Sequence, residues 1–217
     1  MFKEQLFKEA LRAYAGQHVL DRVIAMGRDA FVLGAERRHL TVMWVDTRGV
    51  GGPVSDLAPE KAYASIQNHL RRVLDYVEQT EGIVDSFVGD AVIAYWGTRG
   101  SSNHALRALD CAARILRGAN PAQEGIKPII GVDTGNVSLG NAGTPERIKY
   151  TLMGDVVNLA SRLGDRCSQY GVQVLFSETV LTHAGDAAPP NRVIDSVQIK
   201  GRDGLTDIST LADIRGI

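Results

Sequence analysis

The sequence predicts an α+β domain with a ferredoxin-like βαββαβ core, an antiparallel-rich sheet and flanking helices. Short β-branched runs bounded by glycine or charge indicate buried strands, and longer stretches with apolar residues at helical spacing indicate helices. Their order along the chain is strand, helix, two strands, helix and strand. A chain of 217 residues with 44% hydrophobic content is long enough to bury one substantial core.

The N-terminal part is predicted to be helical and separate from the main domain. Apolar side chains recur at helical spacing from Phe2 to about Met26, and Gly27–Gly34 is interpreted as a linker. We therefore expect residues 1–35 to form an N-terminal extension and residues 36–217 the main domain. Charged residues stand where a signal peptide needs an apolar core, and no stretch approaches the roughly 20 apolar residues of a membrane span. The expectation is a cytoplasmic protein with no membrane partner.

The predicted elements of the main domain follow one another closely. The first strand begins near Leu40 and ends at Asp46, and a glycine-rich loop follows at 49–53. The same two patterns predict the other elements. These are helices at about 59–81, 103–117, 155–170 and 178–183, a hairpin of 83–87 and 91–96, and strands at about 127–133, 136–139, 147–152, 173–176, 192–200 and 207–211.

Composition narrows the classes of function. A net charge of −1, from 24 basic and 25 acidic residues, argues against a general nucleic-acid binder. A ferredoxin-like RNA-binding module would need exposed aromatic side chains and a basic face, and only 6% of the residues are aromatic. Cys111 and Cys167 lack the spacing of metal ligands, which favours buried free thiols in a reducing cytosol.

Two aspartates stand where a predicted strand gives way to a turn. Asp46 ends the run from His39 to Val45, and Asp90 follows the run from Gly82 to Gly89. Carboxylates at the ends of neighbouring strands can hold divalent metal ions over a phosphate chain. Either aspartate alone is equally typical of an ordinary turn, where its side chain bonds the local backbone.

A third segment, Tyr150 to Leu163, reads as a tight turn followed by a helix. Asp155 suits the positive end of the helix dipole, and apolar residues then recur at helical spacing. Asn158 and Arg162 are four residues apart and project from one face. An amide and a guanidinium on one face can bind a sugar oxygen and a phosphate together, although a solvated helix face has the same pattern.

Taken together, these segments resemble the signature motifs of class III nucleotide cyclases. The matching residues are Asp46 to Gly49, the turn of Gly89 and Asp90 before Ala91–Gly97, and Gly154 to Leu163, in family order. The resemblance covers about Glu36 to Leu211. It implies the class III cyclase fold and conversion of a nucleoside triphosphate to a 3′,5′-cyclic nucleotide and pyrophosphate, with two Mg²⁺ or Mn²⁺ ions.

The same resemblance implies a role for each site residue. Asp46, Asp90 and the backbone carbonyl of Thr47 would be metal ligands. Asn158 would orient the ribose, and Arg162 would stabilise charge at the α-phosphate. The terminal phosphates would be bound by the first loop and by a later lysine. These residues are Arg48, Gly49, Val50, Gly51, Gly52 and Lys200. Lys200 could equally be a surface lysine before a turn.

The resemblance also implies a homodimer with composite active sites. The two metal-binding aspartates would come from one chain, and Asn158, Arg162 and Lys200 from its partner. The segment Asn141–Arg147 resembles the arm that reaches across to the other subunit. A monomer would hold half of each site and should be inactive.

The base-reading positions depart from the family pattern. Ser86 stands where adenylate cyclases usually carry Lys and guanylate cyclases Glu. Thr151 stands where adenylate cyclases commonly carry Asp and sometimes Thr, and where guanylate cyclases carry Cys. Both are short, neutral hydroxyls that can donate or accept. Val50 and Gly51 replace the usual Phe and Thr, so the first loop is reshaped as well.

These departures favour a different base and leave three hypotheses open. The first is a pyrimidine cyclase that makes cyclic UMP or cyclic CMP, resembling those of bacterial antiphage defence, whose product triggers a separate effector. The second is an adenylate or guanylate cyclase with an atypical pocket. The third is a non-catalytic nucleotide-binding regulatory module, which predicts the loss of metal or transition-state residues, whereas Asp46, Asp90, Asn158 and Arg162 are all present.

Overall fold

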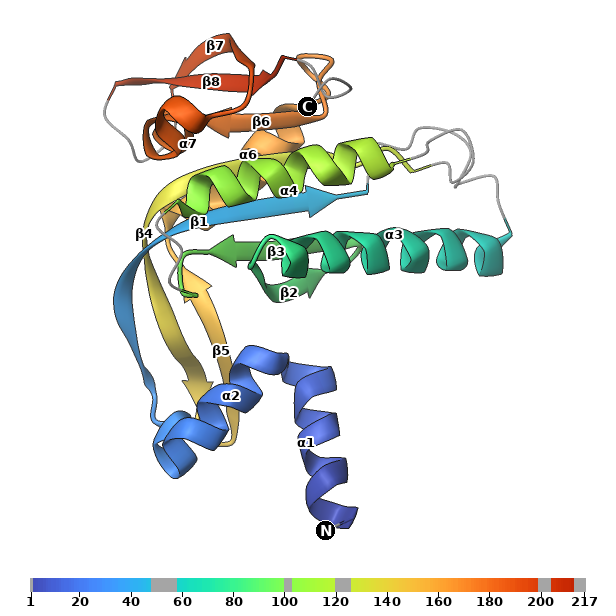
Figure 1. The fold of residues 1–217 in the computed structure, drawn as a ribbon, viewed down its shortest axis with the longest axis vertical. Helices are drawn as coiled ribbons and strands as arrows, with labels where there is room; N and C mark the ends of the chain where they lie inside the picture. The colour runs from blue at the N-terminus through green and yellow to red at the C-terminus, as the bar shows by residue number, and fades with distance from the viewer. Residues whose placement is uncertain (1, 48–57, 100–102, 120–125, 199–203, 213–217) are drawn as a thin grey trace. The chain divides into compact units, whose positions relative to one another are not determined.

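The structure, a computed structural model, describes residues 2–47, 58–99, 103–119, 126–198 and 204–212. It contains two compact units, one of residues 1–38 and 138–153 and the other of 39–137 and 154–217 (Figure 1). The helices are α1 Phe2–Ala15, α2 Gln17–Met26, η1 Gly27–Phe31, α3 Pro59–Gln79, α4 His104–Gly118, α6 Asp155–Arg166, α7 Glu178–Ala184 and η2 Gly185–Ala187. The strands are β1 Gly34–Asp46, β2 Ile83–Val88, β3 Ala91–Trp96, β4 Ile129–Thr144, β5 Arg147–Met153, β6 Val174–Ser177, β7 Asn191–Gln198 and β8 Leu205–Leu211.

The sheet of the second unit has the strand order β2-β3-β1-β4-β6-β8-β7. Its first four strands have the arrangement of a ferredoxin-like βαββαβ core, with β3 antiparallel to both β1 and β2. Further along, β6 runs parallel to β4, and β8 runs antiparallel to both β6 and β7. The predicted α+β class, with its mostly antiparallel sheet and flanking helices, is confirmed.

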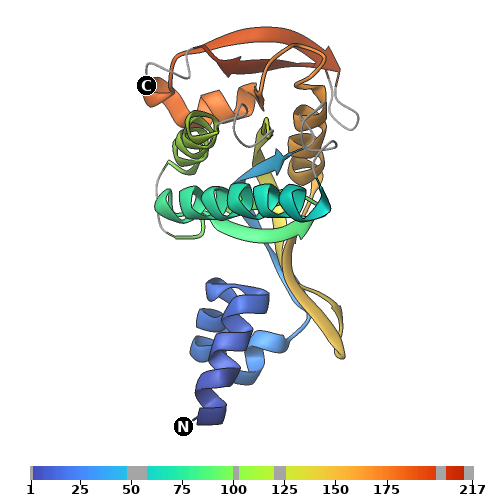
Figure 2. The same cartoon turned by 90° about the vertical axis from the view of Figure 1, so that its right-hand side faces the viewer.

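Helices cover both faces of this sheet. Figure 2 shows α4 and α6 on opposite sides of the strands. Met43 and Val45 of β1 point into the larger apolar cluster, which contains buried side chains of α3, α4 and α7. A second cluster on the other face joins Leu159 and Leu163 of α6 to β4, β6 and β8. A Cβ on Gly131 of β4 would lie 1.9 Å from the Ala160 carbonyl oxygen, so α6 can sit this close only over a glycine.

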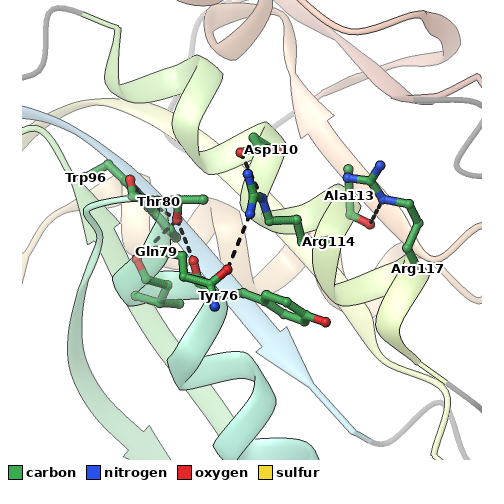
Figure 3. A network of polar contacts seen from close by, with 9 residues as sticks. Tyr76, Gln79, Thr80, Trp96, Asp110, Ala113, Arg114 and Arg117 are labelled. Atoms are coloured by element: carbon green, nitrogen blue, oxygen red, sulfur yellow. Dashed lines mark hydrogen bonds and ion pairs between the residues drawn. The ribbon is translucent and has the colours of Figure 1, made fainter.

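A polar network ties the end of α3 to β3 and α4 (Figure 3). The Trp96 indole N–H donates to the Thr80 carbonyl at 3.1 Å, and the Thr80 hydroxyl donates to the Tyr76 carbonyl at 2.8 Å. Arg114 of α4 reaches the Gln79 side chain at 3.3 Å. The Trp96 indole thus gives a partner to the Thr80 carbonyl, just beyond the last residue of α3, and the three bonds tie the end of α3 to β3 and α4.

The first unit joins the N-terminal helices to the hairpin of β4 and β5. Asn141 is buried in β4, and its side-chain amide donates to the carbonyls of Ala30 at 2.8 Å and Val32 at 2.7 Å. The Arg22 guanidinium lies 4.9 Å from the centre of the Tyr150 ring, a cation–π contact between α2 and β5. These contacts anchor both strands of the hairpin to the N-terminal helices.

Several boundaries differ from the prediction. The expected linker Gly27–Gly34 contains the helix η1, and β1 begins at Gly34 rather than near Leu40. The two strands expected at 127–133 and 136–139 form the single strand β4. The helix expected at 155–170 ends at Arg166. This strand pairs with β6 at 130–132 and with β5 at 138–144, and it continues without a break between the two segments.

Candidate active site

Asp46 and Asp90 converge at one end of the β1–β3 pair. The antiparallel register joins Val45 to Val92, so the residues that leave β1 stand beside those that enter β3. The Thr47 hydroxyl donates to a carboxylate oxygen of Asp90, which bridges the two segments. Antiparallel pairing thus brings together two residues that are far apart in the sequence.

The local backbone explains how each aspartate is held. Asp90 is half-buried in the tight turn between β2 and β3, where Gly89 has φ of 64°, a conformation that favours glycine. Asp46 and Thr47 are buried at the end of β1. A buried carboxylate needs compensation from donors or cations, and Asp46 is a residue with an interaction partner in the structure.

The donor set suits a hard divalent cation. Carboxylate and carbonyl oxygens are the ligands that Mg²⁺ and Mn²⁺ prefer, and Asp46, Asp90 and the Thr47 carbonyl supply them. Within the described ranges, no group of three or more His, Cys, Asp or Glu side chains has the arrangement of a metal centre. Any ion here would therefore depend on two carboxylates together with backbone, water or ligand oxygens.

The strand register places Asp46 on the sheet face that α6 covers. Side chains alternate along a strand, and Met43 and Val45 point to the opposite face with α3 and α4. Trp44 and Asp46 therefore share the α6 face. A Cβ on Gly164 of α6 would touch the Trp44 indole at 3.2 Å, which confirms that α6 packs there.

A β-bulge brings Ser86 to the same face. Val84 pairs with Ala94, but Ser86 pairs with Ile93, so the register shifts by one residue at Asp85. Ile93 pairs in turn with Trp44. Without the bulge, Ser86 would stand opposite Val92 and face the α3 and α4 core. Bulges commonly re-aim side chains beside active sites.

The bulge also brings the Ser86 hydroxyl to the neighbouring carboxylate. Ser86 Oγ donates to Asp85 Oδ2 at 2.6 Å, and both residues are half-buried. Ser86 is thus not isolated but hydrogen-bonded to an acid. Regular strand alternation predicts that adjacent side chains point to opposite faces, so this pair could not be predicted from the sequence pattern.

Asn158 and Arg162 lie on α6 as predicted. Both are exposed, while Val156, Leu159 and Leu163 on the same helix are buried. Within the second unit, their helix packs on the face of the sheet that carries Asp46 and Ser86. Thr151 belongs to the first unit, where it pairs with Gly140 in the β4–β5 hairpin.

The other predicted phosphate-binding residues lie outside the described part of the chain. They are Arg48, Gly49, Val50, Gly51, Gly52 and Lys200. Both cysteines are free and buried, as predicted. Burial raises the pKa of each thiol to about 12, which keeps both protonated near neutral pH.

Residues 35–208, well over half of the chain, match the family model described as the adenylate and guanylate cyclase catalytic domain. The chain belongs to this family. The Thr47–Asp90 bridge and the bulge at Asp85 are thus features of a cyclase-family domain.

Curated relatives agree with this assignment. Adenylate cyclase 1 of Rhizobium meliloti is 31% identical over 183 residues, which cover 80% of this chain and 27% of the relative. The adenylate cyclase of Anabaena cylindrica is 29% identical over 187 residues, covering 80% of this chain and 37% of the relative. The chain thus spans well under half the length of these curated relatives.

Solved cyclase structures share the fold. The adenylyl cyclase CyaB from P. aeruginosa matches with a TM-score of 0.73 at 24% identity, over 83% of this chain and 97% of that one. The guanylyl cyclase Cya2 matches with a TM-score of 0.68 at 29% identity, over 82% and 93%. None of the helices in the described ranges is both long and apolar enough to cross a membrane.

Proposed function

We propose that this cyclase-family chain converts a nucleoside triphosphate into a 3′,5′-cyclic nucleotide and pyrophosphate. The observation that carries the proposal is the convergence of Asp46 and Asp90 at the end of β1 and β3, joined through the Thr47 hydroxyl. A non-catalytic module would have no need of two carboxylates at this point. Asn158 and Arg162, both exposed on α6, add the remaining catalytic side chains.

Each residue has a role that follows from its chemistry. Asp46, Asp90 and the Thr47 carbonyl would hold two Mg²⁺ or Mn²⁺ ions. When bound, such ions lower the pKa of the ribose 3′-hydroxyl and neutralise charge on the triphosphate. Arg162 would stabilise charge that develops at the α-phosphate through bidentate hydrogen bonds. Asn158 would orient the ribose, and the first loop with Lys200 would bind the terminal phosphates.

The proposed enzyme is a homodimer with two composite sites. Asp46 and Asp90 would act from one subunit, and Asn158, Arg162, Thr151 and Lys200 from the other. The exposure of Asn158 and Arg162 supports this arrangement, because their side chains are available to a second subunit.

For the base, we propose a pyrimidine, with UTP ahead of CTP. Ser86 is too short to reach an adenine edge as the usual lysine does, and Thr151 is equally short. The product would then be cyclic UMP, a second messenger read by a separate effector in antiphage defence. The support for this role is the sequence resemblance given above.

A purine cyclase is the second candidate. Relatives carry the names adenylate and guanylate cyclase, and the Ser86–Asp85 pair offers two acceptors that would suit guanine. Both candidates use the same metal-binding aspartates and differ only in the base.

The test is a competition among all four ribonucleoside triphosphates at equal concentration with Mn²⁺ or Mg²⁺, followed by mass identification of cyclic products. The proposal expects a 3′,5′-cyclic nucleotide and an equal amount of pyrophosphate, with cyclic UMP dominant. If cyclic AMP or cyclic GMP is the main product, the pyrimidine assignment is wrong and the chain is a purine cyclase. If no cyclic product forms with either metal, the regulatory-module hypothesis replaces the cyclase.

A further inference from the structure

Asp85 is an acidic residue next to Ser86, the position that is proposed to contact the base. The proposed function gives Asp85 itself no role. We propose that Asp85 is a specificity-determining residue that makes Ser86 an obligate hydrogen-bond acceptor, so that the site selects a base with a ring N–H, namely uracil or guanine. This inference rests on the proposed function, because it takes Ser86 as the residue that reads the base.

The bulge at Asp85 creates this arrangement. It places Ser86 opposite Ile93, on the same sheet face as Trp44 and Asp46. A regular strand would have turned the Ser86 hydroxyl toward the core under α3 and α4. The extra residue in β2 is therefore what lets a short side chain stand on the face of the metal-binding aspartates.

The donors and acceptors that Ser86 has available then determine which bases it can bind. A serine hydroxyl has one proton and two lone pairs, and a carboxylate accepts only. The Ser86 proton points to Asp85 Oδ2 at 2.6 Å, a short bond with a charged acceptor. Toward a ligand, Ser86 Oγ can offer only lone pairs, so its contact on the base must be an N–H.

The four bases differ at the ring nitrogen of their Watson–Crick edge. Uracil has N3–H and guanine has N1–H, and each is flanked by a carbonyl. Adenine N1 and cytosine N3 carry lone pairs that would face the acceptor Ser86 Oγ and the Asp85 carboxylate. Because an unpaired buried acceptor is costly, we expect at least about a tenfold preference for the N–H bases.

The exocyclic amino groups of adenine and cytosine also present an N–H. If adenine or cytosine donated its amino N–H to Ser86 Oγ, the adjacent ring nitrogen would still receive no hydrogen bond from Ser86 or Asp85. The inference therefore predicts discrimination against both amino bases, and it separates UTP from CTP, which size alone does not.

The experiment measures binding and turnover separately. Dissociation constants are determined by calorimetry for the α,β-methylene analogues of UTP, GTP, CTP and ATP, and for the 3-methyluracil and 1-methylguanine analogues, which lack the ring N–H. The variants are Asp85→Asn, whose amide can donate to Ser86 and free its proton, and Ser86→Ala. Asp186→Asn, an exposed acid in η2 of the same unit, is the matched control.

In the parent and in Asp186→Asn, we expect UTP or GTP analogues to bind at least about tenfold more tightly than CTP and ATP analogues, and ring methylation to remove the advantage. In Asp85→Asn and in Ser86→Ala, the ratio of the dissociation constants of the CTP and ATP analogues to those of the UTP and GTP analogues should fall toward one. Equal binding of amino bases by the parent, or an unchanged ratio in both variants, overturns the inference. So does a lack of binding by every analogue.

The failure of the proposed function has a different signature. If the binding preference depends on Asp85 but no triphosphate is cyclised, the cyclase proposal fails and the base-reading role of Asp85 stands. If triphosphates are cyclised with a preference that ignores Asp85, the cyclase proposal stands and this inference alone fails.

Discussion

At the scale of single residues, the site is defined by a hydroxyl that bridges two chain segments. Thr47 leaves β1 beside the turn that carries Asp90, and its hydroxyl donates to the Asp90 carboxylate. This bond orients the carboxylate before any ligand arrives. In the proposed reaction, a carboxylate that is already oriented would stabilise charge at little cost, and this is the role that we propose for Thr47.

Replacement of Asp46 by asparagine should abolish cyclisation with little change in shape. We expect turnover to fall by at least about 100-fold, because a neutral amide is a poor ligand for a divalent cation and removes a charge from the site. Circular dichroism and thermal melting check that the variant is folded. Activity within a few-fold of the parent would show that Asp46 is not a metal ligand.

At the scale of elements, three histidines bring together β1, α4 and α7. The rings of His39 and His183 are stacked with centroids 4.4 Å apart, and His104 lies 5.5 Å from His39 and 6.0 Å from His183. The His104 ring nitrogen Nδ1 is 2.7 Å from the Thr41 hydroxyl. Burial, followed by the charge of His183, lowers the pKa of His39. The buried Asp133, which accepts hydrogen bonds from neighbouring hydroxyls, partly opposes this shift.

This cluster predicts a loss of stability in mild acid. Burial, followed by the charges of His39 and His183, lowers the pKa of His104 from 6.5 to about 4. The unfolded chain therefore takes up a proton first, and the stability present above about pH 6.5 is lost as the pH falls toward about 4. Urea midpoints between pH 7.5 and 4.5 should fall less steeply in His104→Gln than in the parent.

A control outside the cluster is Gln169, an exposed residue without an ionisable side chain. The variant Gln169→Ala should keep the parent's dependence of the urea midpoint on pH. Identical slopes in the parent and in His104→Gln would remove the cluster as a source of acid sensitivity.

The attachment of the N-terminal helices to the β4–β5 hairpin depends on Asn141. Its amide bonds the carbonyls of Ala30 and Val32, so Asn141→Ala should destabilise the first unit by about 1–3 kcal/mol. The readout is faster limited proteolysis of residues 1–33. Asn136→Ala, at an exposed position of the same strand, should leave the cleavage rate unchanged.

The elements and the site differ in how far the sequence predicts them. The βαββαβ order is predictable because each element has a local pattern: β3 is a short, continuous apolar run, and α6 repeats its buried residues at helical spacing. The strand β4 pairs with β6 at 130–132 and with β5 at 138–144, and the local pattern does not encode these pairings with distant segments. The face of Ser86 depends on a bulge at Asp85 that no turn residue signals. Asp46 and Asp90 were predictable because one ends a strand and the other lies in the turn that follows a strand.

At the scale of the whole molecule, the proposed enzyme needs two copies of the chain. The proposed metal ligands Asp46 and Asp90 lie on the same chain as Asn158 and Arg162 of α6. In the proposed dimer, the aspartates of one subunit act together with Asn158 and Arg162 of the other. A closed twofold dimer then has two equivalent composite sites.

Subunit complementation tests this central claim most directly. Asp90→Ala and Arg162→Ala are purified separately, and each should be inactive alone. After subunit exchange, verified independently with labelled chains, the mixture should recover about a quarter of the parent's activity, because roughly half of the dimers are mixed and each mixed dimer holds one intact site. Inactivity of the fully exchanged mixture would contradict catalysis across the dimer.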